Sequence, residues 1–284
     1  MAHIFSLQGR HALVTGATTP LARALAVGLA EAGAHVSVTT TRPERAEEVQ
    51  ANSILNECWA AAGTSGQVRT LDLADAAAVE AAVDALEREV APIDILVNAT
   101  HEANIKPLLE ASLADWQREI DRNVTTTFVA CQAVGRRMVA RGGGRIINLV
   151  SILHDRAVPN CALFSASQAA ILGLTRTLGI EWGRGPADQI ARVTVNALGL
   201  GFYEGVAGPQ NDADLHGILQ RYIPLRRLGE PADLQGALVY LASDTANYMQ
   251  GELVMVDGAI ASHRSEEHTS ELQSRGLISY AVFC

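Results

Sequence analysis

Short runs rich in β-branched residues alternate with longer helical patterns along almost the whole chain. Most of the strand-like runs are apolar on both faces, as in a parallel sheet covered by helices on each side. We expect strands at 11–15, 35–39, 67–73, 93–99, 145–151, 192–198 and 252–257. Helical patterns lie between them at 21–32, 43–62, 75–90, 112–141, 162–182 and 231–243. This alternation predicts βαβ units and hence a doubly wound α/β sheet.

The chain has no internal repeat and no Pro/Ser-rich linker, so residues 1–263 are expected to form a single domain. The composition changes abruptly after Ala259. Residues 264–274 read RSEEHTSELQS, which resembles a sequencing-adapter oligonucleotide translated in frame, and 278–284 resemble its continuation. We therefore interpret 264–284 as an artefact that makes few contacts with the core.

Composition excludes several classes of function. A net charge of −9 and the lack of a basic run argue against nucleic-acid binding, which needs clustered Lys and Arg. No apolar run approaches the roughly 18 residues of a membrane span, and the start does not read as a signal peptide. The cysteines are scattered without a CxxC pair, so neither a metal site nor a disulfide framework is expected; they are Cys58, Cys131, Cys161 and Cys284. A cytoplasmic protein fits.

The segment 199–217, GLGFYEGVAGPQNDADLHG, is the least regular part of the domain and is expected to be a mobile loop. Ligands of doubly wound sheets bind outside the carboxyl ends of the strands. A loop after a late strand could therefore be a lid over a site or only a surface connection, and the sequence leaves both open.

The first strand leads into its helix through VTGATTPLARALA, residues 14–26. A glycine-rich turn at this place lets backbone N–H groups approach a pyrophosphate at the helix N-terminus. Gly16 is the single glycine in this stretch. By itself the turn is a weak signal for dinucleotide binding.

Together with this turn, motifs from residue 5 to 259 resemble the short-chain dehydrogenase/reductase family in their order and spacing. They are TGATTPLA for the family's TGxxxGxG, LDL around Asp72, ILVNATH for LVNNAG, Asn123 in DRNVTTTF, IINLVS ending at Ser151, LFSASQAA for the YxxxK segment, VNALGLGF, and PLRRLGEPADLQGALVYLASDTANYMQGELVMVDGA. The resemblance implies a Rossmann-type fold and an NAD(P)-dependent oxidoreductase.

In that family a tyrosine protonates the substrate carbonyl, and a lysine lowers the tyrosine pKa and holds the nicotinamide ribose. A serine binds the carbonyl and an asparagine anchors a water relay. The resemblance puts Ser151 and Asn123 at the last two positions. Phe164 stands at the tyrosine position and Gln168 at the lysine position. Phe164 has no proton to donate, and Gln168 has no charge to stabilise a tyrosinate.

Two functional hypotheses follow. The first is a degenerate active site on an intact scaffold, non-catalytic or very weakly active, in a partner subunit or a ligand-binding protein. The second is an active NADP(H)-dependent carbonyl or 3-oxoacyl reductase, or an alcohol dehydrogenase, with a substitute proton donor. Tyr203 and His154 are the candidate donors. In the family the helix after the lysine position packs against a partner subunit, and the helix after Gln168 keeps a small and apolar surface. The resemblance therefore implies assembly into a homo- or hetero-dimer or tetramer with a relative.

Cofactor binding is expected to be weak or absent, because the turn has Pro20 and Ala22 at family glycine positions. His101 also replaces a glycine near the expected ribose, and Leu200 replaces a proline beside the nicotinamide. The residues expected to line a cofactor are Gly16, Thr18, Thr19, Leu21, Arg42, Asp72 and Asn98. No acidic residue closely follows the second strand, and Arg42 could meet a 2′-phosphate, which favours NADP(H) over NAD(H). No metal is expected.

Overall fold

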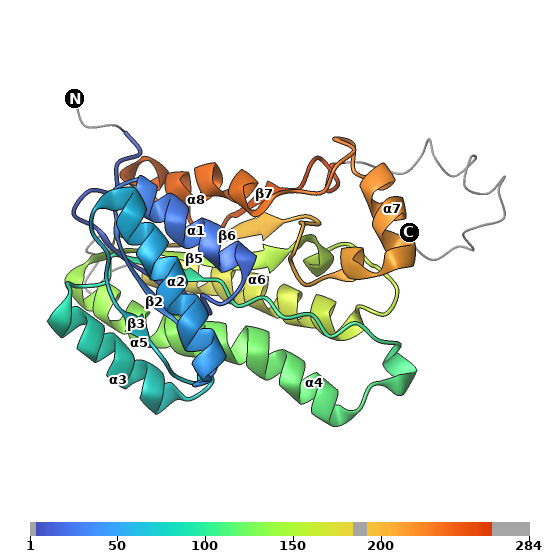
Figure 1. Cartoon of the computed structure of the whole chain (residues 1–284), viewed down its shortest axis with the longest axis horizontal. Coiled ribbons are helices and arrows are strands. Elements are labelled where there is room, and N and C mark those ends of the chain that lie inside the picture. Colours follow the sequence, from blue (N-terminus) through green and yellow to red (C-terminus); the bar gives the residue numbers. More distant parts are fainter. Residues whose placement is uncertain (1–3, 184–191, 263–284) are drawn as a thin grey trace, which may run out of the picture.

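The structure is a computed structural model that describes residues 4–183 and 192–262 (Figure 1). A seven-stranded sheet lies at its centre, with every neighbouring pair of strands parallel. The strands are β1 (His11–Thr15), β2 (His35–Thr39), β3 (Val68–Arg69), β4 (Ile95–Asn98), β5 (Gly143–Ser151), β6 (Arg192–Leu200) and β7 (Leu253–Val256). Their order, β3-β2-β1-β4-β5-β6-β7, confirms the doubly wound α/β sheet.

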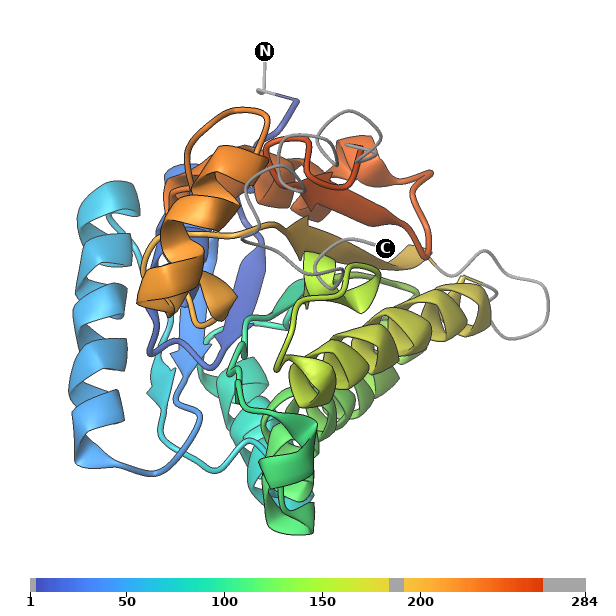
Figure 2. The same cartoon turned by 90° about the vertical axis from the view of Figure 1, so that its right-hand side faces the viewer.

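Helices cover both faces of the sheet (Figures 1 and 2). They are α1 (Pro20–Glu31), α2 (Arg45–Ala62), α3 (Ala76–Glu89), α4 (Leu113–Ile120), α5 (Thr126–Arg141), α6 (Ala162–Trp182), α7 (Ala213–Tyr222) and α8 (Gln235–Ala242). One apolar cluster joins α1, α2 and α8 to the sheet, and a second joins α3 and α5 to its other face. Burial on both faces explains why the strands lack an in–out alternation of polarity.

Helix starts follow the capping residues of the sequence. Thr19 caps α1 ahead of a proline at the first helical position, and Asp75 caps α3. Ser112 and Asp115 form a reciprocal capping box at the start of α4. Side-chain oxygens at these positions satisfy N–H groups that the first helical turn leaves unpaired.

Three sequence-based boundaries need correction. The predicted helix 112–141 contains a π-helical turn, Asp121–Thr125, between α4 and α5. The predicted strand 67–73 is strand only at Val68–Arg69. The predicted loop 199–217 is wrong at both ends, because β6 runs to Leu200 and α7 begins at Ala213. Asp212 caps α7 by accepting from the N–H groups of residues 214 and 215, a signal that was present in the sequence.

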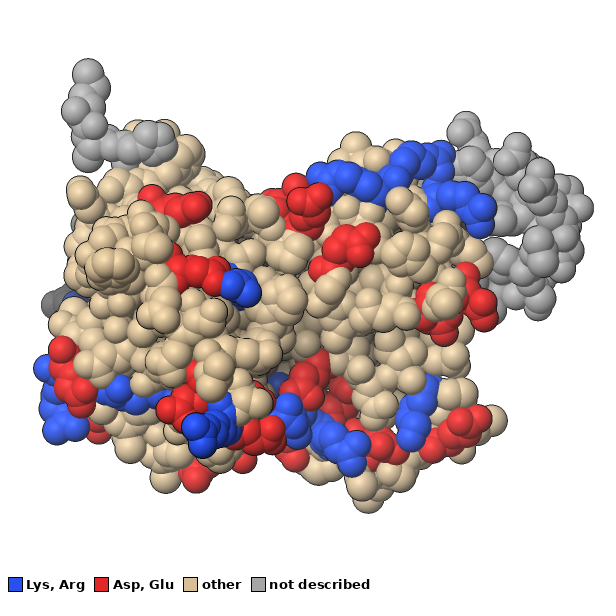
Figure 3. All heavy atoms as spheres, viewed as in Figure 1, with Lys and Arg blue, Asp and Glu red and all other residues tan. Residues whose placement is uncertain are grey.

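The artefact predicted at 264–284 lies outside the described residues. Within the described part of the chain, no helix has the length and apolarity needed to cross a membrane. Acidic and basic side chains are intermixed over α3 and α4 on the face shown in Figure 3. Ion pairs there include Arg137 with Glu80 at 2.8 Å and Lys106 with Asp115 at 3.0 Å.

Candidate active site

The carboxyl ends of the central strands bring the predicted site residues to one edge of the sheet. The strand order reverses between β1 and β4, which is where doubly wound proteins bind ligands. Ser151 ends β5, and its N–H donates to Oε1 of Gln168 on α6 at 2.9 Å. Gln168 is buried, and its Nε2 donates to Oγ of Ser167 at 3.3 Å. The amide is therefore engaged with neighbouring protein groups.

Phe164 lies on α6, one helical turn before Gln168, and only 1% of it is exposed. It belongs to an apolar cluster with Ile152 and Leu153, which directly follow Ser151, and with Phe202 from the segment after β6. Its ring meets the imidazole of His101 edge-on, with centroids 5.1 Å apart. A hydrocarbon ring, which has no proton to donate, thus occupies this part of the site.

His101 comes from the loop after β4 and is also buried. Its Nε2 pairs with the backbone carbonyl of Ala207 at 3.1 Å, which ties the β4 loop to the segment after β6. Burial lowers the pKa of His101 to about 4, so the ring is neutral at neutral pH. Since Nε2 donates to a carbonyl, Nδ1 is the acceptor nitrogen, and it has no hydrogen-bond partner among the described residues.

Asn123 lies in the π-helical turn between α4 and α5 and is fully buried. Its Oδ1 accepts from the N–H of Glu102 at 3.1 Å, and its Nδ2 donates to the carbonyl of the same residue at 2.8 Å. The side chain therefore pins the β4 loop to the helix. Such π-helical turns are frequent at functional sites.

Glu119 is a site residue that the sequence interpretation missed. It lies on α4, 2% exposed, and its Oε1 accepts from Nδ2 of Asn123 at 2.7 Å. Burial, the largest cause, raises the pKa of Glu119 to about 7. The signal was available, because Glu119 precedes Asn123 by four residues and hence shares its helical face.

The two predicted substitute donors are both committed to backbone carbonyls. The hydroxyl of Tyr203 donates to the carbonyl of Val256 at 2.7 Å, and burial raises the tyrosine pKa above its ordinary value. Nδ1 of His154 pairs with the carbonyl of Ser151 at 2.9 Å. Tyr203 packs in the cluster that contains α1 and α8, whereas Phe164 packs in a different one.

The β1–α1 turn keeps part of a phosphate-binding layout. Gly16 has φ +64°, and a Cβ there would come within 2.7 Å of Cγ2 of Thr100, so this position requires glycine. Thr18 follows in the turn, and Oγ1 of Thr19 accepts from the N–H of Ala22 at 3.1 Å. Proline at position 20 offers no N–H, which leaves the N–H of Leu21 among the first-turn donors for an anion.

The far side of this turn is covered by the segment after β6. Gly205 faces Pro20, and a Cβ added to it would lie 3.7 Å from Cγ of Pro20. With the Ala207–His101 hydrogen bond, this segment connects the α1 N-terminus to the β4 loop. The turn fits the phosphates of a dinucleotide, and His101 stands where the resemblance expects a glycine near the ribose.

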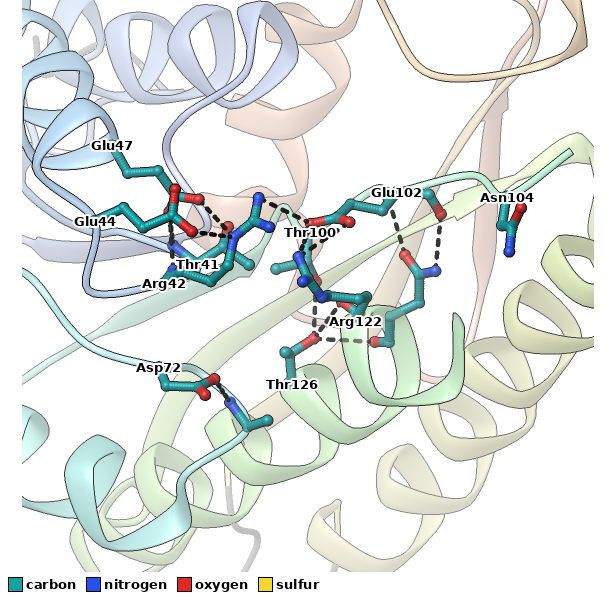
Figure 4. A network of polar contacts seen from close by, with 12 residues as sticks. Thr41, Arg42, Glu44, Glu47, Asp72, Thr100, Glu102, Asn104, Arg122 and Thr126 are labelled. Carbon is teal, nitrogen blue, oxygen red and sulfur yellow. Dashed lines mark hydrogen bonds and ion pairs between the residues drawn. The ribbon is translucent and has the colours of Figure 1, made fainter. Parts of the chain in front are cut away.

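Arg42, at the end of β2, is part of a polar network at the edge of the sheet (Figure 4). Glu47 pairs with it at 3.0 Å and also accepts from the N–H groups of Thr41 and Arg42 at 2.7 and 2.8 Å. Glu102 lies between Arg42, at 4.0 Å, and Arg122, at 2.9 Å. The Arg42 side chain is 40% exposed and so can reach a ligand, but its positive charge is already balanced by the carboxylates of Glu47 and Glu102.

Two further predicted cofactor residues hold local structure. Asp72 is exposed, and its Oδ1 accepts from the N–H of Ala74 at 2.9 Å (Figure 4). Asn98 is buried at the end of β4, and its Nδ2 donates to Oδ1 of Asn148 at 2.8 Å. In the described ranges no three His, Cys, Asp or Glu side chains are grouped to hold a metal ion.

The sheet order and the β1–α1 turn define a class, the Rossmann-type proteins that bind a dinucleotide at a topological switch point. Residues 16–260 match the family model described as enoyl-(acyl carrier protein) reductase. The chain belongs to the short-chain dehydrogenase/reductase family.

Relatives agree with this assignment. D-threitol dehydrogenase of Mycolicibacterium smegmatis is 37% identical over 257 residues, 89% of this chain and 94% of that protein. Gluconate 5-dehydrogenase of Gluconobacter oxydans is 34% identical, over 92% of this chain and 98% of that protein. The crystal structure of a gluconate 5-dehydrogenase from Burkholderia cenocepacia with NADP and tartrate has a TM-score of 0.82 at 32% identity, covering 92% of this chain and 98% of that one.

Proposed function

We propose that this chain is a family member with a degenerate active site, non-catalytic or very weakly active, which binds a ligand or serves as a partner subunit. The observation that carries the proposal is the packing of Phe164 and Gln168. Phe164, which has no proton to donate, is buried with its ring edge-on to His101. The side-chain amide of Gln168 is hydrogen-bonded to Ser151 and Ser167. General acid catalysis contributes about 10²–10⁴ in rate, and here its ordinary source is missing.

We infer weak binding of NADP(H), tighter than that of NAD(H). Gly16 and the N–H of Leu21 support binding of the phosphates, and Arg42 offers a cation to a 2′-phosphate. Glu47 and Glu102 already balance that cation. Pro20 and His101 replace glycines of the family, and Gln168 lacks the charge of the family's lysine, which weakens binding. Calorimetric titration of the purified protein with NADPH and NADH tests this. Sub-micromolar affinity for NADH would refute both the weakness and the preference.

Assembly with a second family subunit, a copy or a relative, is part of the proposal. A groove between α5 and α6 is lined by Phe128, Leu174, Leu178 and Trp182, among others. Phe128, which lines this groove, is 46% exposed. Contiguous exposed apolar surface of this kind is typical of interaction sites. Light scattering on the purified chain, with and without a co-expressed relative, measures the assembly. A stable monomer in both cases would contradict it.

A cytoplasmic location also remains part of the proposal.

The second candidate is an active NADP(H)-dependent reductase or dehydrogenase with a substitute proton donor. Its candidate donors are Tyr203 and His154, although each already pairs with a backbone carbonyl. The names of the relatives favour it. The relatives are named dehydrogenases of D-threitol and gluconate, so oxidation of these two compounds is the first assay. Wild-type turnover that is lost in Tyr203→Phe or in His154→Ala would support this candidate over the first.

A further inference from the structure

Glu119 is a buried carboxyl group that three donors surround. Besides Nδ2 of Asn123 at 2.7 Å, its Oε2 accepts from the N–H of Asn104 at 3.0 Å. Oγ of Ser167 lies 3.4 Å from its Oε1. These contacts join α4 to the β4 loop, the π-helical turn and α6. A buried carboxyl at such a junction has to be accounted for, because burying a charge without a cation is costly.

Among the described residues, no cation forms an ion pair with Glu119. The loop after β4 contributes Glu102, whose charge also raises the pKa of Glu119. The nearest cation in that loop, Lys106, is paired with Asp115 at 3.0 Å, and Arg122 is paired with Glu102 at 2.9 Å.

The helix α6 contributes no charge to this contact either. Cys161, just before α6, has a pKa of about 11, raised first by burial and then by the charge of Glu119. Gln168 is neutral, where a lysine would have placed an ammonium one residue from Ser167. With a neutral residue at position 168, burial is the largest influence on the pKa of Glu119 and raises it to about 7.

The Ser167 hydroxyl connects Glu119 to the rest of the site. Its one hydrogen has two acceptors, the carbonyl of Phe164 at 2.8 Å and Oε1 of Glu119 at 3.4 Å. Nε2 of Gln168 donates to the same hydroxyl, and Oε1 of Gln168 accepts from the N–H of Ser151. An ionised Glu119 draws the hydroxyl hydrogen toward itself, whereas a protonated one leaves it on the carbonyl of Phe164.

We propose that Glu119 is a positioning residue that couples ligand binding at this site to one proton. Its carboxyl group orients Asn123 and Ser167, and in the ionised form it adds a buried negative charge beside the site. Anionic ligands, of which NADPH is the probe, then bind better to the protonated form. Binding at higher pH takes up one proton from water onto the carboxylate. Only the choice of NADPH as probe rests on the proposed function.

The carboxyl group itself is tested by ¹³C NMR of protein labelled at glutamate side-chain carboxyls. The Glu119→Gln variant assigns the resonance, and Glu110→Gln, at an exposed position in the same region, is the matched control. We expect the Glu119 resonance to titrate near pH 7. A midpoint at its ordinary value near 4.5 overturns the proposal.

Coupling to ligands is tested by the affinity for NADPH between pH 6 and 8.5. In wild type and in Glu110→Gln the affinity for NADPH should fall as the pH rises, and the fall should be several-fold steeper than in Glu119→Gln. Coupling to one proton limits this fall to about tenfold per pH unit. The ligand's own phosphate titration is common to all three proteins. Parallel profiles would overturn the coupling. Failure of every protein to bind NADPH would refute the cofactor part of the proposed function, and the NMR midpoint then decides the role of Glu119.

Discussion

Replacing Glu119 by glutamine should remove a large part of the pH dependence of stability. The pKa of this group is raised in the folded protein, so the folded state binds its proton more tightly than the unfolded chain does. The resulting stabilisation is complete below about pH 4.5 and is lost as the pH rises to about 7. At about 1.4 kcal/mol per pH unit, the interval from 4.5 to 7 corresponds to about 3 kcal/mol of unfolding free energy.

The assay is urea unfolding of wild type, Glu119→Gln and Glu110→Gln at a series of pH values, followed by tryptophan fluorescence. The Glu119→Gln variant has an NH₂ group in place of one carboxyl oxygen, so it loses the hydrogen bond from either the N–H of Asn104 or the amide of Asn123. This lowers the free energy of unfolding by a constant amount. That loss does not change with pH. The difference in stability between variant and wild type should therefore move by about 3 kcal/mol in favour of the variant from pH 4.5 to 8. A pH-independent difference would refute the reasoning.

Three further predictions concern other residues of the site. Tyr203→Phe should lower the free energy of unfolding by about 1–2 kcal/mol in urea, because the carbonyl of Val256 loses its buried donor, and a loss of ligand binding at unchanged stability would contradict this. Arg42→Ala should weaken NADPH binding more than NADH binding in calorimetry, and equal losses would exclude a contact with the 2′-phosphate. His101→Gly should tighten NADPH binding and increase amide exchange at residues 203–211, since the bond to Ala207 is gone; slower exchange would show that this bond does not hold the segment.

The sheet could be predicted from the sequence because its strands are buried on both faces and each run of apolar residues ends at a turn. β1 and β2 have the predicted bounds, as does α6. The helix α7 could not be found in this way, since only Leu219 is buried in it and its apolar pattern is short. Capping by Asp212 was the remaining signal, in a segment whose Gly and Asn content indicated a loop.

The site was predictable in position but less so in chemistry. The resemblance puts Ser151 and Gln168 at positions of one site, and in the structure the N–H of Ser151 donates to the amide of Gln168. Which partner each polar side chain takes depends on contacts between distant segments. Tyr203, for example, donates to a carbonyl 53 residues away. The role of Glu119 depends on burial between three elements, which the helical pattern alone does not reveal.

The central proposal is that Phe164 and Gln168, at the positions of the family's tyrosine and lysine, leave the chain non-catalytic or very weakly active. Steady-state turnover with NADPH and carbonyl substrates, and with NADP and gluconate or D-threitol, tests it in wild type, Phe164→Tyr, Gln168→Lys and the double variant. The effects of residues that act as a unit are not additive, so each single change should recover little activity. The double variant should gain activity only if Pro20, Ala22 and His101 still admit the cofactor, and without such a gain exclusion of the cofactor is the dominant defect. Negligible turnover of wild type is the predicted result. Wild-type turnover in the usual range of about 1–10³ s⁻¹ would contradict the account.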